Sequence, residues 1–351
     1  MDLKFCSEKY RIMKCISGSR AYGLDTPESD IDYRGVFMVP REFLYSPFYK
    51  IEQIQKHSEE DDIQYYSIDK LFKLLGDNNP NIIELLYMPK DNLIETHPIW
   101  DMIVNNRDMF LHKGAYYRFS GYAHAQLKRI KGHNKYISNP MPKTKPVAID
   151  FFEAHGIKNN KYITPKDYKE EFEYWQHVMG AKPLKENIFL IYKNGKGLFN
   201  KEGNLLSNYE NNYDKSSEIV GIGIFKKEEY KQQLHKWKDY WNWVKNRNVK
   251  RNDLEQKYGY DTKHGSHLAR LLLMCKYILK EHNVYVRLPE KDLDFVRKIK
   301  FGKVSYDNLI KWAEDMDILN KKLYDVSTLQ SRPNLKKIND LYMHINSVFW
   351  N

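Results

Sequence analysis

A Gly-Ser turn between two short apolar runs constrains the N-terminal fold more than any other feature. The run Arg11–Ile16 leads into Ser17-Gly18-Ser19, and a second run, Asp30–Val39, stops at Pro40. Runs of this length and composition predict β-strands, and the proline ends the second one. The connection between them has room for one short helix or loop.

The next elements extend this pattern. Ile63–Tyr66 has the composition of a third strand, and Ser67 then caps a helix whose apolar positions follow helical spacing until Gly76. Asn79-Pro80 has the form of an N-cap followed by proline at the first helical position, which predicts another short helix. The N-terminal region is therefore expected to be a compact α/β unit with a mixed sheet.

The rest of the chain is mostly helical in pattern, with an irregular middle. Helical periodicity covers the ranges Glu228–Arg247, His264–His282, Glu290–Lys298 and Tyr306–Leu323. In the middle, Ile188–Tyr192, Asn194-Gly195 and Leu198-Phe199 suggest a hairpin, with Ile219–Phe225 as a further partner strand. We therefore predict one domain over residues 1–110 and a mostly helical domain over residues 111–351, with a hairpin and loop region inserted near 140–225.

Two aspartates at the start of the second strand are the first candidate site residues. Asp30 and Asp32 alternate at i and i+2, so both carboxylates leave the same strand face, close enough to bridge hard cations through oxygen ligands. A third carboxylate is expected from a neighbouring strand, and we choose Asp62 over Glu60 and Asp61. Asp62 has the competing interpretation of a solvated acidic run.

The turn upstream suits a phosphate. Gly18 lets the backbone approach an anion closely, and Ser19 offers a hydroxyl and an N–H at the start of a helix. Arg20 and Arg34 are candidates for further phosphate contacts. Each motif alone is common in proteins without this chemistry, but their order, spacing and strand context together favour a nucleotide site.

These residues resemble a known family. Gly-Ser followed, after a short helix, by Asp-x-Asp on a strand is the signature of the DNA polymerase beta-type nucleotidyltransferase superfamily. The longer strings Gly18-Ser-Arg-Ala-Tyr-Gly23 and Ser29-Asp-Ile-Asp-Tyr-Arg-Gly35 are similar to a bacterial and phage branch of predicted nucleotidyltransferases, some of which are associated with RNA repair. Further similar strings are Asn79-Pro80 with Glu84-Leu85-Leu86, and Tyr260-Asp-Thr-Lys-His264 with His267-Leu-Ala-Arg270.

The resemblance implies a polymerase beta-like core and transfer of a nucleoside monophosphate from a nucleoside triphosphate to a hydroxyl, with release of pyrophosphate. Two Mg²⁺ ions on Asp30, Asp32 and Asp62 and a triphosphate at Gly18 and Ser19 are the implied ligands. The acceptor expected first is an RNA end, such as a tRNA-like one. Two alternatives stay open: nucleotidylation of a protein or small molecule, and a noncatalytic module that binds nucleotide or RNA. The nucleoside triphosphate used and the oligomeric state are also left open.

A basic segment suggests the RNA partner. The chain carries 57 Lys and Arg against 46 Asp and Glu, a formal charge of +11 that favours polyanionic partners. Residues 112–147 contain no acid but interleave lysines and arginines with aromatic residues, which suits contacts with an RNA backbone and stacked bases. An ordinary helix with aromatic residues in the core and lysines outside explains the same pattern.

A second group of cations is predicted on a later helix. Lys263, His267 and Arg270 fall on one helical face at i, i+4 and i+7, from which they would reach a nucleotide phosphate or base; the alternative is a solvated basic face. Cys6, Cys15 and Cys275 show no metal-like pairing and are expected to be buried thiols. No apolar run has the length of a signal peptide or membrane helix, so a cytoplasmic protein without a membrane partner is expected.

Overall fold

The computed structural model describes residues 9–57, 61–158, 161–163, 180–195, 199–206, 213–246 and 249–351. The chain divides into two compact units, the first made of Met1–Ile137 and Val249–Asn351 and the second of Ser138–Asn248. This division differs from the predicted boundary near residue 110, because the helical segments on either side of the second unit share one core with the N-terminal sheet.

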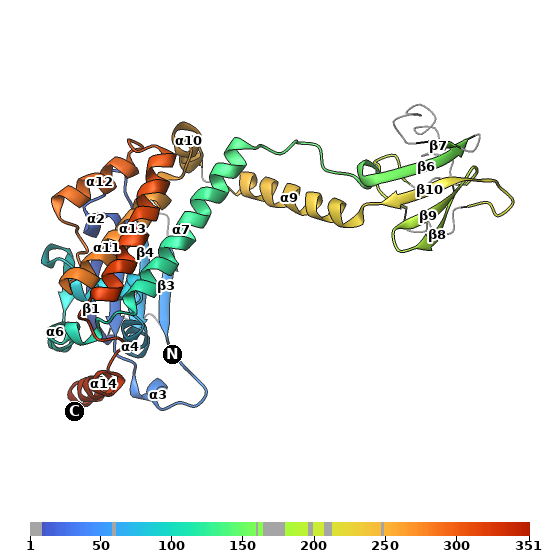
Figure 1. Ribbon diagram of the computed structural model, residues 1–351. Coiled ribbons are helices and arrows are strands. Elements are labelled where there is room, and N and C mark those ends of the chain that lie inside the picture. The colour runs from blue at the N-terminus through green and yellow to red at the C-terminus, as the bar shows by residue number, and fades with distance from the viewer. Residues whose placement is uncertain are drawn as a thin grey trace. The chain divides into compact units, whose positions relative to one another are not determined.

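The first unit is built on a mixed five-stranded sheet (Figure 1). Its strands are β1 (Arg11–Ser17), β2 (Ile31–Phe37), β3 (Gln53–His57), β4 (Asp61–Ser67) and β5 (Leu93–Thr96), in the order β3-β4-β2-β1-β5. The pair β2 and β4 is parallel, and the other neighbouring pairs are antiparallel. The predicted α/β class with a mixed sheet, followed by a mostly helical C-terminal region, is confirmed.

Local sequence explains where the helices begin. The helices of this unit are α2 (Gly18–Tyr22), α3 (Arg41–Leu44), α4 (Ile68–Gly76), α5 (Pro80–Ile83), α6 (Pro98–Asn105), α7 (Ala115–Ser138), α10 (Val249–Tyr258), α11 (Thr262–Glu281), α12 (Glu290–Lys300), α13 (Tyr306–Val326) and α14 (Leu335–Trp350). The Ser67 hydroxyl accepts a hydrogen bond from the Lys70 amide at the start of α4, and the Asn79 side chain accepts one from the Asn81 amide at the start of α5. Both predicted caps are confirmed.

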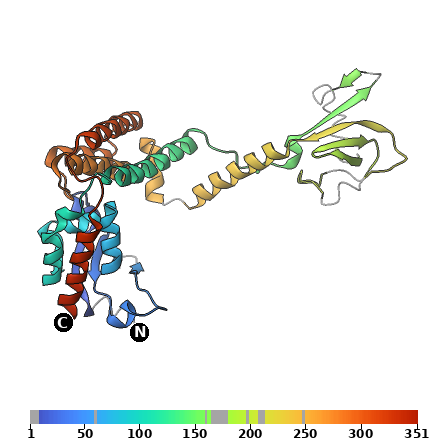
Figure 2. The same ribbon diagram turned by 60° about the horizontal axis from the view of Figure 1, so that its bottom comes forward.

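The core of the first unit joins sheet and helices. Ile12 and Val36 from the sheet, Phe119 from α7 and Leu272 from α11 are all buried in one continuous apolar cluster. The C-terminal helix α14 lies beside α4 and α6 (Figure 2). Burial of these apolar side chains in one cluster holds α7 and α11 to the strands that carry the predicted carboxylates.

The second unit is a five-stranded antiparallel sheet with one long helix. Its elements are β6 (Phe152–Lys158), β7 (Lys161–Ile163), β8 (Gly180–Lys185), β9 (Ile188–Tyr192), β10 (Ile219–Phe225) and α9 (Lys227–Lys245), with the strand order β7-β6-β10-β9-β8. The predicted pairing of Ile188–Tyr192 with Ile219–Phe225 is confirmed. The predicted hairpin that pairs Ile188–Tyr192 with Leu198-Phe199 is wrong at Phe199, because β8 and β10 occupy both edges of β9 and Phe199 bridges to Leu205. The turn between β8 and β9 runs through Asn187, at φ 61°, and Leu198 lies outside the described residues.

Two smaller expectations concern burial and membranes. Cys15 and Cys275 are buried free thiols, and Cys6 lies outside the described residues. Within the described ranges, no helix combines the length and the apolar character that crossing a bilayer requires.

Candidate functional site

Gly18 and Asp32 lie against each other where β1 ends and β2 begins. Ser17 pairs in register with Asp32, and the Ser17 hydroxyl lies 3.4 Å from the Asp32 carbonyl oxygen. Gly18 has φ +64°, and a Cβ built on it would lie 1.8 Å from Asp32 Oδ2. Only glycine fits this backbone conformation beside the carboxylate, so the Gly-Ser turn and the second aspartate form one local structure.

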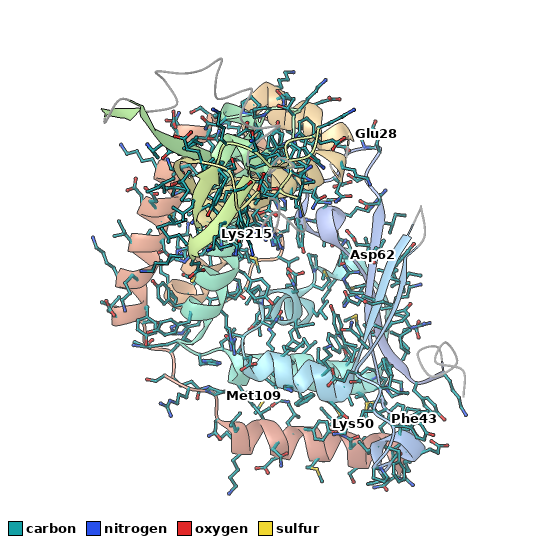
Figure 3. All side chains as sticks on the ribbon, turned by 90° about the vertical axis from the view of Figure 1, so that its right-hand side faces the viewer. Glu28, Phe43, Lys50, Asp62, Met109 and Lys215 are labelled. Atoms are coloured by element: carbon teal, nitrogen blue, oxygen red, sulfur yellow. The ribbon has the colours of Figure 1, made fainter. Side chains whose placement is uncertain are left out.

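The third predicted carboxylate lies next to the second. Asp62 pairs in register with Asp32 across the parallel strands β2 and β4, and residues opposite each other on neighbouring strands point to the same face of a sheet. Asp30 lies one residue before β2 begins and is exposed. Figure 3 shows Asp62 toward the end of the sheet at which Glu28 lies, with Phe43 and Lys50 at the opposite end.

Arg34 lies between two of these carboxylates. Its Nη2 is 3.0 Å from Asp62 Oδ2 and 3.9 Å from Asp32 Oδ1, and Nη1 donates to the Asp62 carbonyl oxygen at 3.3 Å. Arg34 was predicted to contact phosphate. In this structure its guanidinium neutralises the two carboxylates, and the phosphate contact stays a prediction.

The charges around Asp32 affect its protonation. Burial raises the pKa of the Asp32 carboxyl, and the neighbouring carboxylates of Asp30 and Asp62 act in the same direction. The Arg34 guanidinium and the Lys263 ammonium oppose this rise in pKa. A carboxylate repelled by its neighbours and partly withdrawn from water gains from any added cation, which is the electrostatic condition for a metal ligand.

The donor set fits a hard divalent cation. Asp30, Asp32 and Asp62 supply only carboxylate oxygens, which magnesium prefers over nitrogen or sulfur. Among the residues that the structure describes, no group of three His, Cys, Asp or Glu side chains is gathered closely enough to hold a metal ion. In this arrangement the Arg34 guanidinium, rather than a cation, balances the charges of Asp32 and Asp62.

Arg20 shapes the loop before Asp30. Its Nη2 donates to the Ser29 carbonyl oxygen at 3.2 Å, and the Ser29 hydroxyl accepts from the Thr26 amide at 2.9 Å. Arg20 was predicted as a phosphate contact, and this hydrogen bond holds the backbone next to Asp30. Since α2 has only five residues, its helix dipole would add little to phosphate binding.

Two lysines from the helical region approach the carboxylates. Lys263, in the first turn of α11, is exposed and acts electrostatically on Asp32. Lys300, the last residue of α12, donates a hydrogen bond to the Leu24 carbonyl oxygen. Burial lowers the pKa of Lys300, as does the Lys263 ammonium, while Asp25 and Asp30 oppose this. Sequence reasoning identified Lys263 but missed Lys300, because only the packing of α12 brings it to this site.

Arg270 occupies a different place from the one predicted. It is buried, its Nη1 lies 3.1 Å from Glu84 Oε2, and its guanidinium carbon is 3.3 Å from the Tyr22 ring centroid. The Tyr22 hydroxyl donates to Glu84 Oε1 at 2.8 Å. A direct contact between Arg270 and a nucleotide is not supported, because this guanidinium is already paired inside the core. The sequence string Glu84-Leu85-Leu86 does not by itself indicate this role for Glu84.

On α11, His267 lies between Lys263 and Arg270. Burial lowers the pKa of His267 to about 3, with the Arg270 guanidinium acting in the same direction. The side chain is therefore a neutral imidazole at pH 7. A neutral ring suits hydrogen bonding to a base or sugar better than charge pairing with a phosphate.

The basic segment 112–147 contains both buried and exposed parts. Ala115, Phe119, Ala123 and Ile130 lie in the core, which fits the ordinary interpretation of a helix with an apolar inner face. Tyr117, Lys128, Lys131 and Lys135 are exposed on the outer face of α7. The buried aromatic residue cannot stack on a base, whereas the exposed side chains are accessible.

A mixed sheet that sets Asp-x-Asp beside a Gly-Ser turn is consistent with a polymerase beta-like domain. Residues 7–147 match the RNA repair pathway DNA polymerase beta family, RlaP. The match covers β1 to β5, α7 and every predicted site residue before Lys263. The predicted resemblance to this RNA-repair-associated branch is thus confirmed for residues 7–147.

A phage protein is also similar. The chain is 28% identical over 115 residues to an uncharacterized 38.9 kDa protein of Enterobacteria phage T4 from the nrdC-mobD intergenic region. The similarity covers 28% of this chain, and it spans about a third (32%) of the length of the phage protein. No solved structure matches the chain.

Proposed function

We propose that the first unit transfers a nucleoside monophosphate from a nucleoside triphosphate to a hydroxyl group at an RNA end. The acceptor oxygen would attack the α-phosphorus, the bond from that phosphorus to the β-phosphate oxygen would break, and pyrophosphate would leave with release of the hydroxyl proton. The register of Asp32 with Asp62, beside the turn at Gly18, carries this proposal.

The carboxylates would hold the reacting phosphate through divalent cations. Asp30, Asp32 and Asp62 provide the oxygen ligands, and Mg²⁺ bound there would neutralise charge on the attacking and leaving oxygens. Arg34 must then release Asp62, at a modest energetic cost for a partly exposed ion pair. The freed guanidinium would remain within reach of the triphosphate.

The polyphosphate tail would lie between the turn and the two lysines. The Ser19 hydroxyl and amide would donate to phosphate oxygens from one side, and Lys263 and Lys300 would approach from the helices. Repulsion between two neighbouring ammonium groups, which contributes to the lowered pKa of Lys300, is relieved when an anion binds.

RNA as the acceptor is supported by two observations. The family that residues 7–147 match is described as part of an RNA repair pathway, and the acid-free segment 112–147 belongs to the same matched range. A protein or small-molecule acceptor would use the same carboxylates without needing this basic surface. The salt dependence of binding separates the two, since phosphate contacts release counterions.

The test is transfer of label from each α-labelled nucleoside triphosphate to single-stranded RNA and to tRNA in the presence of Mg²⁺. Asp32→Asn should abolish transfer, because the amide preserves size but removes the charge that binds a cation. Asp340→Asn on the exposed face of α14 is the matched control and should retain full activity.

Three results would count against the proposal. Undiminished transfer by Asp32→Asn would place the chemistry elsewhere. Label transferred to the protein itself, or to a small-molecule hydroxyl, would replace RNA as the acceptor. Tight nucleotide binding without transfer to any acceptor would identify a noncatalytic nucleotide-binding module.

A further inference from the structure

Three tyrosines form a cluster on the surface of the first unit. Tyr116 and Tyr117, in the first turn of α7, meet Tyr324 from the last turns of α13, and the three ring centroids are 5.2 to 5.4 Å apart. Tyr117 is 59% exposed. Tyr117 contacts both other rings in T-shaped geometry, so it is held in place while much of its surface faces solvent.

Lysines surround this cluster. Lys321 Nζ lies 4.6 Å from the Tyr324 ring centroid and 5.7 Å from that of Tyr116, and Lys113 Nζ lies 5.7 Å from Tyr324. Exposed cation–π contacts are weak, at about 0.5–1 kcal/mol, and a phosphate anion competes well for such ammonium groups. Aromatic rings and cations therefore occupy one patch.

The patch continues along the outer face of α7. Positions at helical spacing form a single stripe running from Tyr117 to Lys135, with His124, Lys128 and Lys131 between them. At 1.5 Å rise per residue, this stripe is about 27 Å long. A shallow groove follows its second half, lined by His124, Leu127, Lys128, Lys131, Gly132 and Lys135.

Acidic residues of α13 border the stripe on one side, where α7 and α13 run together (Figure 1). Glu314 lies 3.1 Å from Lys131 Nζ, and Asp317 accepts from the Ser120 hydroxyl at 3.0 Å and lies 3.4 Å from His124. These pairs anchor the stripe to α13. Lys113 and Lys128 add further positive charge beside this border.

We infer that the tyrosine cluster and the lysine stripe of α7 form a binding track for single-stranded RNA, with a base stacked on Tyr117 and the backbone following the lysines. The inference rests on the proposed function for the choice of RNA. Single-strand sites combine a cationic groove with aromatic rings and cover about 4–16 nucleotides, and a track of about 27 Å suits the lower end of that range.

Charge and chemistry favour RNA over other occupants. An acidic peptide would pair with the lysines but has no flat rings to match the exposed face of Tyr117. A second copy of this chain, with a formal charge of +11, would place like charges together at this surface. Unpaired nucleotides offer both phosphates and π-faces.

The experiment measures binding of a fluorescently labelled, twelve-nucleotide single-stranded RNA to the full chain. Fluorescence anisotropy monitors the binding over a series of salt concentrations, in the absence of nucleoside triphosphate. Tyr117→Ala should weaken binding roughly tenfold or more, as loss of a stacked base predicts, and Tyr117→Trp should retain it. Lys321→Ala should weaken binding and reduce the salt slope by about one. Tyr45→Ala, the same change at a residue that is 77% exposed on another surface, is the control and should bind as the wild type does.

The binding measurements test the RNA track independently of the nucleotidyl-transfer assay. Wild-type affinity in both Tyr117→Ala and Lys321→Ala would overturn the inference, and so would equal losses in Tyr117→Ala and Tyr45→Ala. Loss of self-association in Tyr117→Ala with unchanged RNA binding would show an interface between copies instead. Because Asp32→Asn should still bind this RNA, a chain that binds RNA through Tyr117 but transfers no nucleotide would refute only the proposed function. Circular dichroism of each variant, with Tyr117→Leu as a second apolar replacement, excludes unfolding as the cause.

Discussion

The guanidinium of Arg270 lies 3.1 Å from the carboxylate of Glu84, and the two side chains are only 3% and 5% exposed. Tyr22 completes the contact, with its hydroxyl on Glu84 and its ring beside the guanidinium. Tyr22 ends the helix that begins at Gly18, and Arg270 belongs to the helix that carries Lys263. This buried ion pair therefore fixes the Gly-Ser turn relative to a cation of the proposed triphosphate site.

Glu84→Gln should lower the free energy of unfolding by about 3–5 kcal/mol, because it leaves a buried guanidinium without its counter-charge. Urea unfolding followed by fluorescence measures this. The matched control is Glu290→Gln, which removes the carboxylate 2.8 Å from Arg297 in an exposed pair and should cost less than about 1 kcal/mol. Similar losses in the two variants would show that burial does not determine the contribution of the Glu84 pair.

Gly18→Ala should reduce nucleotidyl transfer by roughly a hundredfold, because the added Cβ must displace the Asp32 carboxylate and strain a backbone at φ +64°. Transfer assays at saturating nucleotide measure the effect. Gly76→Ala is the control, since no atom lies within 4 Å of its added Cβ at the end of α4. The control should keep its transfer rate. Equal activity in both variants would argue against the close packing of Gly18 on Asp32.

Lys300→Met should raise the KM for nucleoside triphosphate roughly tenfold or more while lowering kcat less, because a charge-assisted hydrogen bond to phosphate is lost. Steady-state kinetics with varied nucleotide measure both constants. Lys298→Met changes an exposed lysine on the same helix and should leave KM unchanged. If the two variants behave alike, Lys300 does not contact the triphosphate.

His267 should make the protein less stable as the pH falls. Its pKa is about 3 in the folded protein, against 6.5 for an unperturbed histidine. Below pH 6.5 the unfolded chain takes up a proton that the folded protein does not, so the free energy of unfolding falls by up to about 1.4 kcal/mol per pH unit. Urea unfolding between pH 7.5 and 5 measures this slope. His267→Gln should flatten the dependence, and an unchanged slope in that variant would assign the effect to other groups.

Much of the N-terminal fold could be predicted from local sequence. Alternating and continuous apolar runs marked β1, β2 and β4, and Ser67 and Asn79 marked two helix starts, because capping and strand periodicity depend on neighbouring residues. The hairpin through Asn194-Gly195 was predicted wrongly for a related reason. A turn signal shows where a chain can reverse, but the strand that β9 pairs with is chosen by packing.

The order of residues along the chain defines the chemistry that is possible: carboxylates at i and i+2 on one strand, a glycine able to adopt positive φ, and an acid-free basic segment. Which distant groups meet depends on the packing of the folded chain. It paired Asp62 with Asp32 across parallel strands, brought Lys300 from the end of α12, and buried Arg270 on Glu84, 186 residues away in sequence. Spacing along a chain fixes the direction of neighbouring side chains, whereas contacts between distant segments depend on how helices and sheet share one core.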